Sequence, residues 1–504
     1  MFGSGVWLLA VALGACGART SLELDLVDDG GSTSVADGGR SSSGSAGRAF
    51  GGTLGGGSGP ASPGGAMNGG APVAGGSDGG AVNGGSAGAG DAGSPAAPPI
   101  TDIAAHGERT CARFADGSIE CWGSNFDGQL GYGNRLDVSV PASVGAVSVS
   151  RGRSPTVSKL GGGRPQNCVV LSDGSAKCWG SNEYAQLGAG NLLAIGDDEL
   201  PASVGPISIT TRPHVFVTSV VGGDLHTCAL LSDGSVSCWG SGCCNGHDRP
   251  VTGSDLPSSV GPVILVDTPG ITTLALAADG SHTCALLSDG SLTCWGRSDF
   301  GELGYGNTAA IGYGVEPVAA GRVSVTSTPG RVVTQVAAGY AHTCALLSDG
   351  SLKCWGWNLS GQLGSGDHQN IGDDELPASA LDIRVTTTAG VTVKQVAAGG
   401  RHTCALLSDD TVKCWGDNSY GQLGYGNTHL GDQSPSLLPP VSITTLPGVR
   451  VEQLSLGDYH SCARLSDGSA KCWGMNHDGQ LGTGDTSNVG DDELPSSLGP
   501  IVTH

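Results

Sequence analysis

Cysteine is the residue type that the sequence most clearly arranges for chemistry. Fourteen of the 17 cysteines form seven pairs with nine residues between the partners, and successive pairs begin 56 to 60 residues apart. This spacing differs from the C-x2-C pairs of zinc sites, and so many cysteines are rare in a reducing compartment. We therefore expect seven disulfides in an oxidising compartment, with buried reduced thiols as the alternative. The predicted pairs are Cys111–Cys121, Cys168–Cys178, Cys228–Cys238, Cys284–Cys294, Cys344–Cys354, Cys404–Cys414 and Cys462–Cys472.

Two further cysteines, Cys243 and Cys244, interrupt the repeated pattern. They stand in a short segment, residues 241–247, where most other copies have a Gly-Gln-Leu-Gly loop or a variant of it. Adjacent cysteines could form a strained vicinal disulfide or link to another chain. We consider two hypotheses: this loop is a specialised surface, or it is a variation without function.

Three loops carry the same acidic sequence, Gly-Asp-Asp-Glu-Leu-Pro, at residues 196–201, 372–377 and 490–495. Clustered carboxylates can hold Ca²⁺, which takes six to eight oxygen ligands, but the spacing is not that of an EF-hand. We expect solvated loops and no cofactor. Calcium is kept as a hypothesis that calorimetry at millimolar Ca²⁺ tests.

Histidine and tryptophan recur at fixed positions of the repeat. Symmetry spreads such residues around a repeated structure, whereas a metal site needs three or four converging ligands. We therefore expect structural hydrogen bonds from the histidines and packing between units from the tryptophans. No Ser/His/Asp or Cys/His grouping stands out for nucleophilic catalysis, so we expect no enzyme activity, no catalytic residue and no metal site. The histidines are His226, His282, His342, His402 and His460, replaced by Arg109 and Gln166 in the first two copies; the tryptophans are Trp122, Trp179, Trp239, Trp295, Trp355, Trp415 and Trp473.

Seven copies of one unit position these residues. Each copy has a β-branched run, a glycine turn, a second strand, a Ser-Asp-Gly turn or a close variant of it, a third strand ending in Cys-Trp-Gly, and a Pro-containing final strand. Four short strands repeated seven times, without helical periodicity, predict an all-β, seven-bladed β-propeller of four-stranded blades. The three-residue turn at 348–350 places Cys344 opposite Cys354, within the distance of a disulfide.

The N-terminal part of the chain has a different composition. Residues 6–13 are apolar but too few to span a bilayer, and they lead into Leu13-Gly14-Ala15-Cys16, the order of a bacterial lipobox. We expect residues 1–16 to be a signal peptide with a lipobox and Cys16 to carry a lipid. Plain secretion is the alternative, and the lack of Lys or Arg in residues 1–5 leaves the true start open. Residues 17–99, rich in Gly, Ala, Ser and Pro, are expected to be a disordered low-complexity linker.

The propeller is expected over residues 100–504, and this part carries most of the negative charge. The chain has 24 Lys and Arg against 46 Asp and Glu, of which 3 and 7 precede residue 100, leaving 21 and 39 in the repeats. An acidic surface repels phosphate backbones, so we expect no nucleic acid partner. The predicted blades span residues 100–155, 156–214, 215–270, 271–329, 330–388, 389–447 and 448–504.

The block G-x-x-H-T-C-A-L-L-S-D-G-S-L-K-C-W-G-x-N-x-x-G-Q-L-G resembles the regulator-of-chromosome-condensation repeat. The likeness covers nearly all of residues 100–504, and it implies a seven-bladed propeller. The Gly-Gln-Leu-Gly stretch is weakened in two copies and absent from the third. It is intact at residues 128–131, 361–364, 421–424 and 479–482.

The resemblance also implies functions. The founding activity of that family is guanine-nucleotide exchange on a small nuclear GTPase, which uses an insertion in one blade that this sequence does not contain. Exported bacterial members, among them a β-lactamase inhibitor, bind another protein through one face of the ring. We expect a surface-anchored or secreted interaction module in the cell envelope, at the outer membrane or outside the cell.

Its expected partner is a protein or glycan at the cell surface, and it would meet the membrane only through an N-terminal lipid. The alternatives are a secreted inhibitor of an extracellular enzyme, a nucleotide exchange factor, an enzyme that uses a propeller face, and a structural role in the envelope. The oligomeric state is left open.

Overall fold

The computed structural model describes residues 98–504 except 153, 243, 248–252, 254, 313, 430 and 432. The predicted signal peptide, the lipid on Cys16 and nearly all of the predicted linker lie outside these residues, as does Cys243. Within the described part of the chain, no helix is long and apolar enough to cross a membrane.

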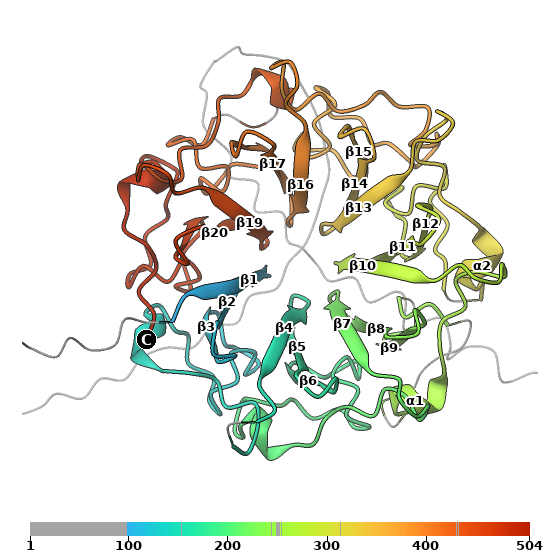
Figure 1. The fold of residues 1–504 in the computed structure, drawn as a ribbon, viewed down its shortest axis with the longest axis vertical. Coiled ribbons are helices and arrows are strands. Elements are labelled where there is room, and N and C mark those ends of the chain that lie inside the picture. The colour runs from blue at the N-terminus through green and yellow to red at the C-terminus, as the bar shows by residue number, and fades with distance from the viewer. Residues whose placement is uncertain are drawn as a thin grey trace, which may run out of the picture. The chain divides into compact units, whose positions relative to one another are not determined.

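Seven sheets surround a central axis, and each consists of three antiparallel strands that follow one another in the sequence (Figure 1). The prediction of an all-β, seven-bladed propeller is confirmed. The strands nearest the axis are β1 (Ile100–His106), β4 (Val157–Gly162), β7 (Val217–Gly222), β10 (Thr273–Asp279), β13 (Val333–Ala338), β16 (Val393–Ala398) and β19 (Val451–Leu456). The middle strands are β2 (Arg109–Phe114), β5 (Gln166–Leu171), β8 (His226–Leu231), β11 (His282–Leu287), β14 (His342–Leu347), β17 (His402–Leu407) and β20 (His460–Leu465). The third strands are β3 (Ile119–Gly123), β6 (Ala176–Gly180), β9 (Val236–Gly240), β12 (Leu292–Gly296), β15 (Leu352–Gly356), β18 (Val412–Gly416) and β21 (Ala470–Gly474).

The predicted fourth strand of each blade is wrong. In six blades its segment begins at a proline, which has no backbone N–H and starts a short helical turn. Beyond the turn a single residue donates its N–H to the third strand, as Val323 does to Leu292 (2.9 Å) and Ile383 to Leu352 (2.8 Å). Because only one hydrogen bond joins it to the sheet, this segment is extended but does not form a strand. The turns are η1 (Pro141–Ser143), η2 (Pro201–Ser203), α1 (Pro257–Val260), α2 (Pro317–Ala320), η3 (Pro435–Leu437) and η4 (Pro495–Ser497).

The hairpin between the middle and third strands has the predicted geometry. In the turn at 348–350, Gly350 has a φ of 79°, a conformation that glycine adopts without steric cost. The register places Cys344 directly opposite Cys354. The same register recurs in every blade, and all seven predicted disulfides are formed, with Cα atoms 4.1 Å apart.

The repeated tryptophans join neighbouring blades. Trp355 Nε1 donates to the backbone carbonyl of Glu302 in the preceding blade (3.0 Å), and all seven rings are at most 1% exposed. Trp295 is the exception, since its buried Nε1 has no hydrogen-bond partner among the described residues. The bond is also made by Trp122, Trp179, Trp239, Trp415 and Trp473.

The repeated histidines also link one blade to the next. His342 Nε2 lies 2.9 Å from Thr403 Oγ1 of the following blade, and that hydroxyl donates to the Gln362 carbonyl (2.8 Å). Because the hydroxyl proton is used, Nε2 must be the donor to Thr403. Burial lowers the pKa of His342 to about 3, so the ring is neutral. His226, His282, His402 and His460 make the equivalent contact.

Arg109 and Gln166 take over this interblade role in the first two blades. Arg109 Nη2 donates to the carbonyls of Gly163 (2.6 Å) and Gln166 (2.7 Å) in the second blade. Gln166 Nε2 donates to the carbonyls of Gly223 and His226 in the third, both at 3.1 Å. The hydrogen-bonded link therefore continues although the side chain changes.

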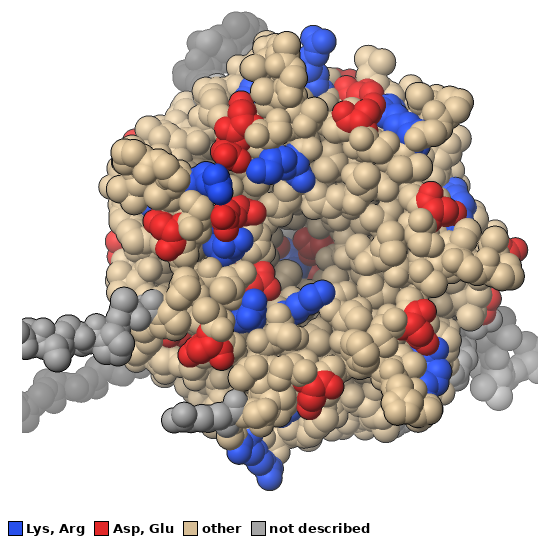
Figure 2. All heavy atoms as spheres, viewed as in Figure 1, with Lys and Arg blue, Asp and Glu red and all other residues tan. Residues whose placement is uncertain are grey.

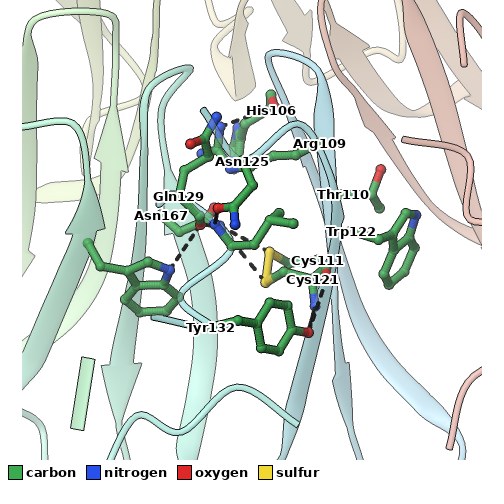
Figure 3. The surroundings of a disulfide bond; sticks show 12 residues. His106, Arg109, Thr110, Cys111, Cys121, Trp122, Asn125, Gln129, Tyr132 and Asn167 are labelled. Atoms are coloured by element: carbon green, nitrogen blue, oxygen red, sulfur yellow. Dashed lines mark hydrogen bonds between the residues drawn. A yellow bond between two sulfur atoms is a disulfide. The ribbon is translucent and has the colours of Figure 1, made fainter. Parts of the chain in front are cut away.

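Each disulfide lies within the wall between blades, as Figure 3 shows for the first. Asn167 of the second blade donates from Nδ2 to Cys111 Sγ (3.2 Å) and to the Gln129 carbonyl (2.6 Å). The Tyr132 hydroxyl donates to the Cys121 carbonyl (3.1 Å). The disulfides are thus part of the packing between blades and present no sulfur to the surface.

The ring closes between the seventh and first blades with the same contacts as elsewhere. Trp122 Nε1 donates to the Gln480 carbonyl (3.0 Å), and the Ile100 N–H donates to the Gly468 carbonyl (2.8 Å). Every sheet is made of consecutive strands, so no strand is exchanged at the closure.

Candidate functional site

One face of the ring collects side chains that differ from blade to blade. The first and third strands of each blade run in the same direction, so the turns after the first strands and the loops after the third strands lie together. The first loop residue donates its N–H to the adjacent turn, as Trp357 does to Ala341 (2.8 Å). We call this surface the loop face. It comprises the loops after the third strands and the turns at 107–108, 163–165, 223–225, 280–281, 339–341, 399–401 and 457–459.

Arg164 crosses the axis at the loop face. It lies in the turn after β4, and its guanidinium pairs with Asp458 from the turn after β19 and with Asp224 from the turn after β7 (Nε to Oδ1, 3.7 Å). The guanidinium carbon also lies 4.6 Å from the centre of the Tyr340 ring, in the turn after β13. One side chain therefore connects four blades.

The innermost strands enclose an axial cavity of about 300 Å³. Its wall is mostly small and apolar, with residues such as Ala104, Ala277 and Ala337. Asp279, the last residue of β10, lies at the end of this wall nearest the loop face. Figure 2 shows the ring hollowed at its centre, with acidic and basic side chains inside the hollow.

Carboxylates outnumber cations around Arg164. Burial raises the pKa of Asp279 to about 7, and the charges of Asp458 and Asp224 add to the shift while Arg164 opposes it. Burial also raises the pKa of Asp224, and it raises that of Glu108 to about 7. Burial alone would lower the pKa of Arg164, but the surrounding carboxylates raise it. Four carboxyls therefore lie around Arg164 at the centre of the loop face, and Arg109 is a second buried cation beside them.

Aromatic side chains follow one another through the loops of the fourth to seventh blades. The rings of Phe300 and Trp357 have centres 5.6 Å apart, and the Arg401 guanidinium lies 4.9 Å from the centre of the Trp357 ring. Tyr420 lies 5.4 Å from Tyr459. We call these five residues the aromatic arc. Aromatic side chains and arginine are enriched at the centres of protein interfaces.

The three Gly-Asp-Asp-Glu loops also reach the loop face. In each loop the three carboxylates offer oxygens within 4.8 Å of one another, and we call these groups the first, second and third carboxylate triads. Each triad packs on a glycine of the preceding blade; a Cβ on Gly301 would lie 2.3 Å from the Asp373 nitrogen. Converging carboxylates are what Ca²⁺ requires; the prediction stays solvated loops without a cofactor, with calcium binding as the alternative hypothesis. The triads are Asp197, Asp198 and Glu199; Asp373, Asp374 and Glu375; and Asp491, Asp492 and Glu493.

The loop with Cys243 and Cys244 does not present Cys244 to solvent, because that residue is fully buried. The loop is shorter than its counterparts. Gly246 follows Gly240 by six residues, whereas the equivalent Gly131 follows Gly123 by eight. Both Gly246 and Gly131 lie beside an interblade tryptophan.

Sequence reasoning missed the residues at the centre of the loop face. Arg164, Asp224 and Asp458 occupy variable positions just before the repeated histidine, and each belongs to a different copy. No local motif marks them. A comparison of the same position across the seven copies is the signal that could have found them, since the propeller brings that position to the axis in every blade.

The chain is similar to known propeller proteins. The family model described as RCC1-like domain matches residues 196–501. The Ultraviolet-B receptor UVR8 of Arabidopsis thaliana is 29% identical over 391 residues, which are 76% of this chain and 79% of the receptor. The E3 ubiquitin-protein ligase HERC2 of Homo sapiens is 27% identical over 77% of this chain, which spans only 7% of that ligase.

Solved structures share the fold. Yeast RCC1 (Prp20), in its complex with Kap60, superimposes with a TM-score of 0.59 at 21% identity, covering 80% of this chain and 85% of that chain. Human WBSCR16 superimposes with a TM-score of 0.58 at 20% identity, covering 76% and 92%.

Proposed function

The chain belongs to the RCC1-like domain family, and we propose from this membership that it is a binding module that holds a protein partner on its loop face. Yeast RCC1, which shares the fold, has been solved bound to the protein Kap60. A rigid ring with variable loops on one face is well suited to this task, because little conformational entropy is lost when a partner binds.

The observation that carries the proposal is the aromatic arc beside the carboxyls around Arg164. The repeated residues, including the disulfides, histidines and tryptophans, build the walls between blades and are buried. The residues that break the repeat gather on the loop face instead. Phe300 is 37% exposed and Leu359 is 68% exposed there, so apolar surface is available to a partner.

A protein fits this face better than a glycan. A sugar ring binds by stacking on an open aromatic face, but Arg401 and Phe300 already pack on Trp357. A protein can instead bury the edges of these side chains and pair with the carboxylates around them.

We extend the proposal to mechanism and location. The module would act by binding and not by catalysis, because the repeated histidines are neutral, buried and used in interblade hydrogen bonds. Seven disulfides suit an oxidising compartment, which supports export to the cell envelope or beyond, with the propeller anchored through a lipid on Cys16.

The test compares two double variants of the full chain with wild type. Trp357→Ser with Tyr420→Ser alters the aromatic arc, whereas Leu274→Ser with Leu446→Ser removes side chains that are each 58% exposed near the starts of β10 and β19, on the opposite face. Each protein is used to capture binding proteins from the envelope and secreted fractions of the cells that make it, and affinities for the captured protein are then measured.

We expect a partner that wild type and the Leu274/Leu446 variant bind equally and that the Trp357/Tyr420 variant binds at least about tenfold more weakly. Equal affinity for all three proteins, or loss only in the Leu274/Leu446 variant, would contradict binding by the loop face. Capture of a glycan instead of a protein would contradict the proposal that the partner is a protein.

A further inference from the structure

A cleft of about 480 Å³ lies on the loop face where the fourth and fifth blades meet. One side is apolar and formed by Phe300, Trp357 and Leu359. The other side is the second carboxylate triad, with its neighbours His368, Gln369 and Asn370. Apolar surface beside three carboxylates is suited to a ligand that is both flat and positively charged.

Within the described part of the chain, no lysine or arginine pairs with the second triad. Among the described residues, no ion pair includes Asp373, Asp374 or Glu375; the polar contact to this group comes from Asn370 Nδ2, 3.3 Å from Asp373 Oδ2. Burial and the neighbouring Asp374 raise the pKa of Glu375, as expected for carboxylates that repel one another.

The first triad shows that such carboxylates can bind a guanidinium group. There, the guanidinium of Arg135, in the preceding blade, pairs with Asp197 at 2.7 Å. Arg135 follows the Gly-Asn turn at 133–134, in which the Asn134 side chain accepts the N–H of Leu136 (2.9 Å). A guanidinium is flat and offers donors in a plane, which matches a pair of carboxylate oxygens.

The second triad has the same backbone turn beside it but no arginine. The Asn307 side chain accepts the N–H of Ala309 (2.9 Å), so the backbone turn is the one seen in the first blade. The residue at the position of Arg135 is Thr308, which is too short and carries no charge. The neighbouring positions differ too: Asp127 and Ser181 beside the first triad are replaced by Phe300 and Trp357 beside the second.

We propose that the cleft between the fourth and fifth blades receives an arginine side chain of the protein partner, in the place that Arg135 fills at the first triad. This inference rests on the proposed function, because it names one contact of the loop face with its partner. The guanidinium would pair with the second triad, and its aliphatic part would pack on Phe300 and Leu359. Charge complementarity favours such a residue, since the chain has a net charge of −22.

The test uses the full chain and the peptide acetyl-Gly-Arg-Gly-amide as a probe. Binding is followed by the indole N–H resonance of Trp357, assigned through Trp357→Phe, while the resonances of the buried tryptophans report that the fold is intact. The control peptide carries norleucine in place of arginine. We expect the arginine peptide to shift the Trp357 resonance in a saturable way and the norleucine peptide to leave it in place.

Two sets of variants make the result specific. Thr308→Arg should occupy the triad from within, as Arg135 does, and weaken the peptide about tenfold or more; Asp373→Asn with Asp374→Asn and Glu375→Gln should do the same. The matched control, Asp197→Asn with Asp198→Asn and Glu199→Gln, should leave peptide affinity unchanged because the first triad is already paired. An unshifted Trp357 resonance, or equal binding to the Thr308→Arg variant, would overturn the inference.

The same variants separate this inference from the proposed function. A partner that the loop face binds equally well in wild type and in Thr308→Arg would overturn the arginine contact and leave the proposed function intact. A partner that binds the opposite face would overturn the proposed function, whatever the peptide does.

Discussion

Asp410 stands in the sixth blade where all six of the other hairpin turns have glycine, at a φ of 65°. A residue with a Cβ is strained in this conformation, and glycine is not. We expect Asp410→Gly to stabilise the protein by about 0.5–1 kcal/mol, reduced slightly by loss of the exposed ion pair with Lys394 (3.0 Å). The free energy of unfolding in guanidinium chloride checks this.

The equivalent glycine of the fifth blade is the control. A Cβ on Gly350 would lie 2.7 Å from the Thr392 Cβ, and φ is again positive. Gly350→Ala should therefore destabilise the protein by about 1–2 kcal/mol. An unchanged stability in both variants would mean that the turn carries no strain.

Single residues were predictable where the repeat supports them and not elsewhere. The cysteine pairs follow from a spacing that occurs seven times and from a turn length that fixes the register. Arg164 and its carboxylate partners could not be inferred in the same way, because each is one residue in one copy and only the closed ring brings them together.

At the scale of the element, the histidine contacts between blades should make stability depend on pH. The pKa of His342 is lowered to about 3 in the folded protein, below its ordinary 6.5. Between these values the unfolded chain binds more protons than the folded one, so this contribution is present above pH 6.5 and is lost as the pH falls toward 3.

His342→Gln isolates this contribution, since Gln166 fills the same position in the second blade. The difference in unfolding free energy between wild type and the variant should shrink by about 1.4 kcal/mol for each pH unit below 6.5. The buried carboxyls with raised pKa values are present in both proteins, so their contributions cancel in this difference. A difference that stays constant between pH 7.5 and pH 4.5 would show that the ring is not held neutral.

The junction of the third and fourth blades should tolerate the loss of its tryptophan nitrogen. Trp295 Nε1 has no acceptor, whereas Trp355 Nε1 donates to Glu302. We expect Trp355→Phe to cost about 1 kcal/mol more unfolding free energy than Trp295→Phe, because only the former breaks a hydrogen bond. If both substitutions lowered the free energy of unfolding equally, Trp295 Nε1 would have a hydrogen-bond acceptor in solution.

The elements themselves were predictable except for the last one in each blade. β-branched runs and Ser-Asp-Gly turns specify three strands, and the structure has them. The sequence also predicts a fourth strand in the proline-containing segment. It cannot be one, since the proline starts a helical turn and only one later N–H reaches the sheet.

For the whole molecule, export and anchoring stay predictions that peptide mapping tests. Protein purified from its own cells under non-reducing conditions, with free thiols blocked at lysis, should give seven linked cysteine pairs and a lipid mass on Cys16. Seven disulfides in one chain need an oxidising compartment to form. Free thiols throughout, with an intact Met1, would place the protein in a reducing compartment.

The architecture of the whole ring followed from counting the repeats, but its asymmetry did not. Seven equal units predict a ring in which every blade presents the same residues to the solvent. The structure instead has charged residues gathered around Arg164 and an aromatic arc in the fourth to seventh blades, besides the exposed Phe126 and Tyr184 in the loops of the first and second. That asymmetry is where we place the partner.

Hydrogen–deuterium exchange of the full chain, alone and with its captured partner, tests the binding face most directly. We predict slower exchange on binding in the loop-face segments 297–302, 357–361, 399–401, 417–421 and 457–459, with the hairpin turns on the opposite face unchanged. Protection of those hairpin turns, such as 348–350 and 408–410, with the loop face unchanged, would contradict the account.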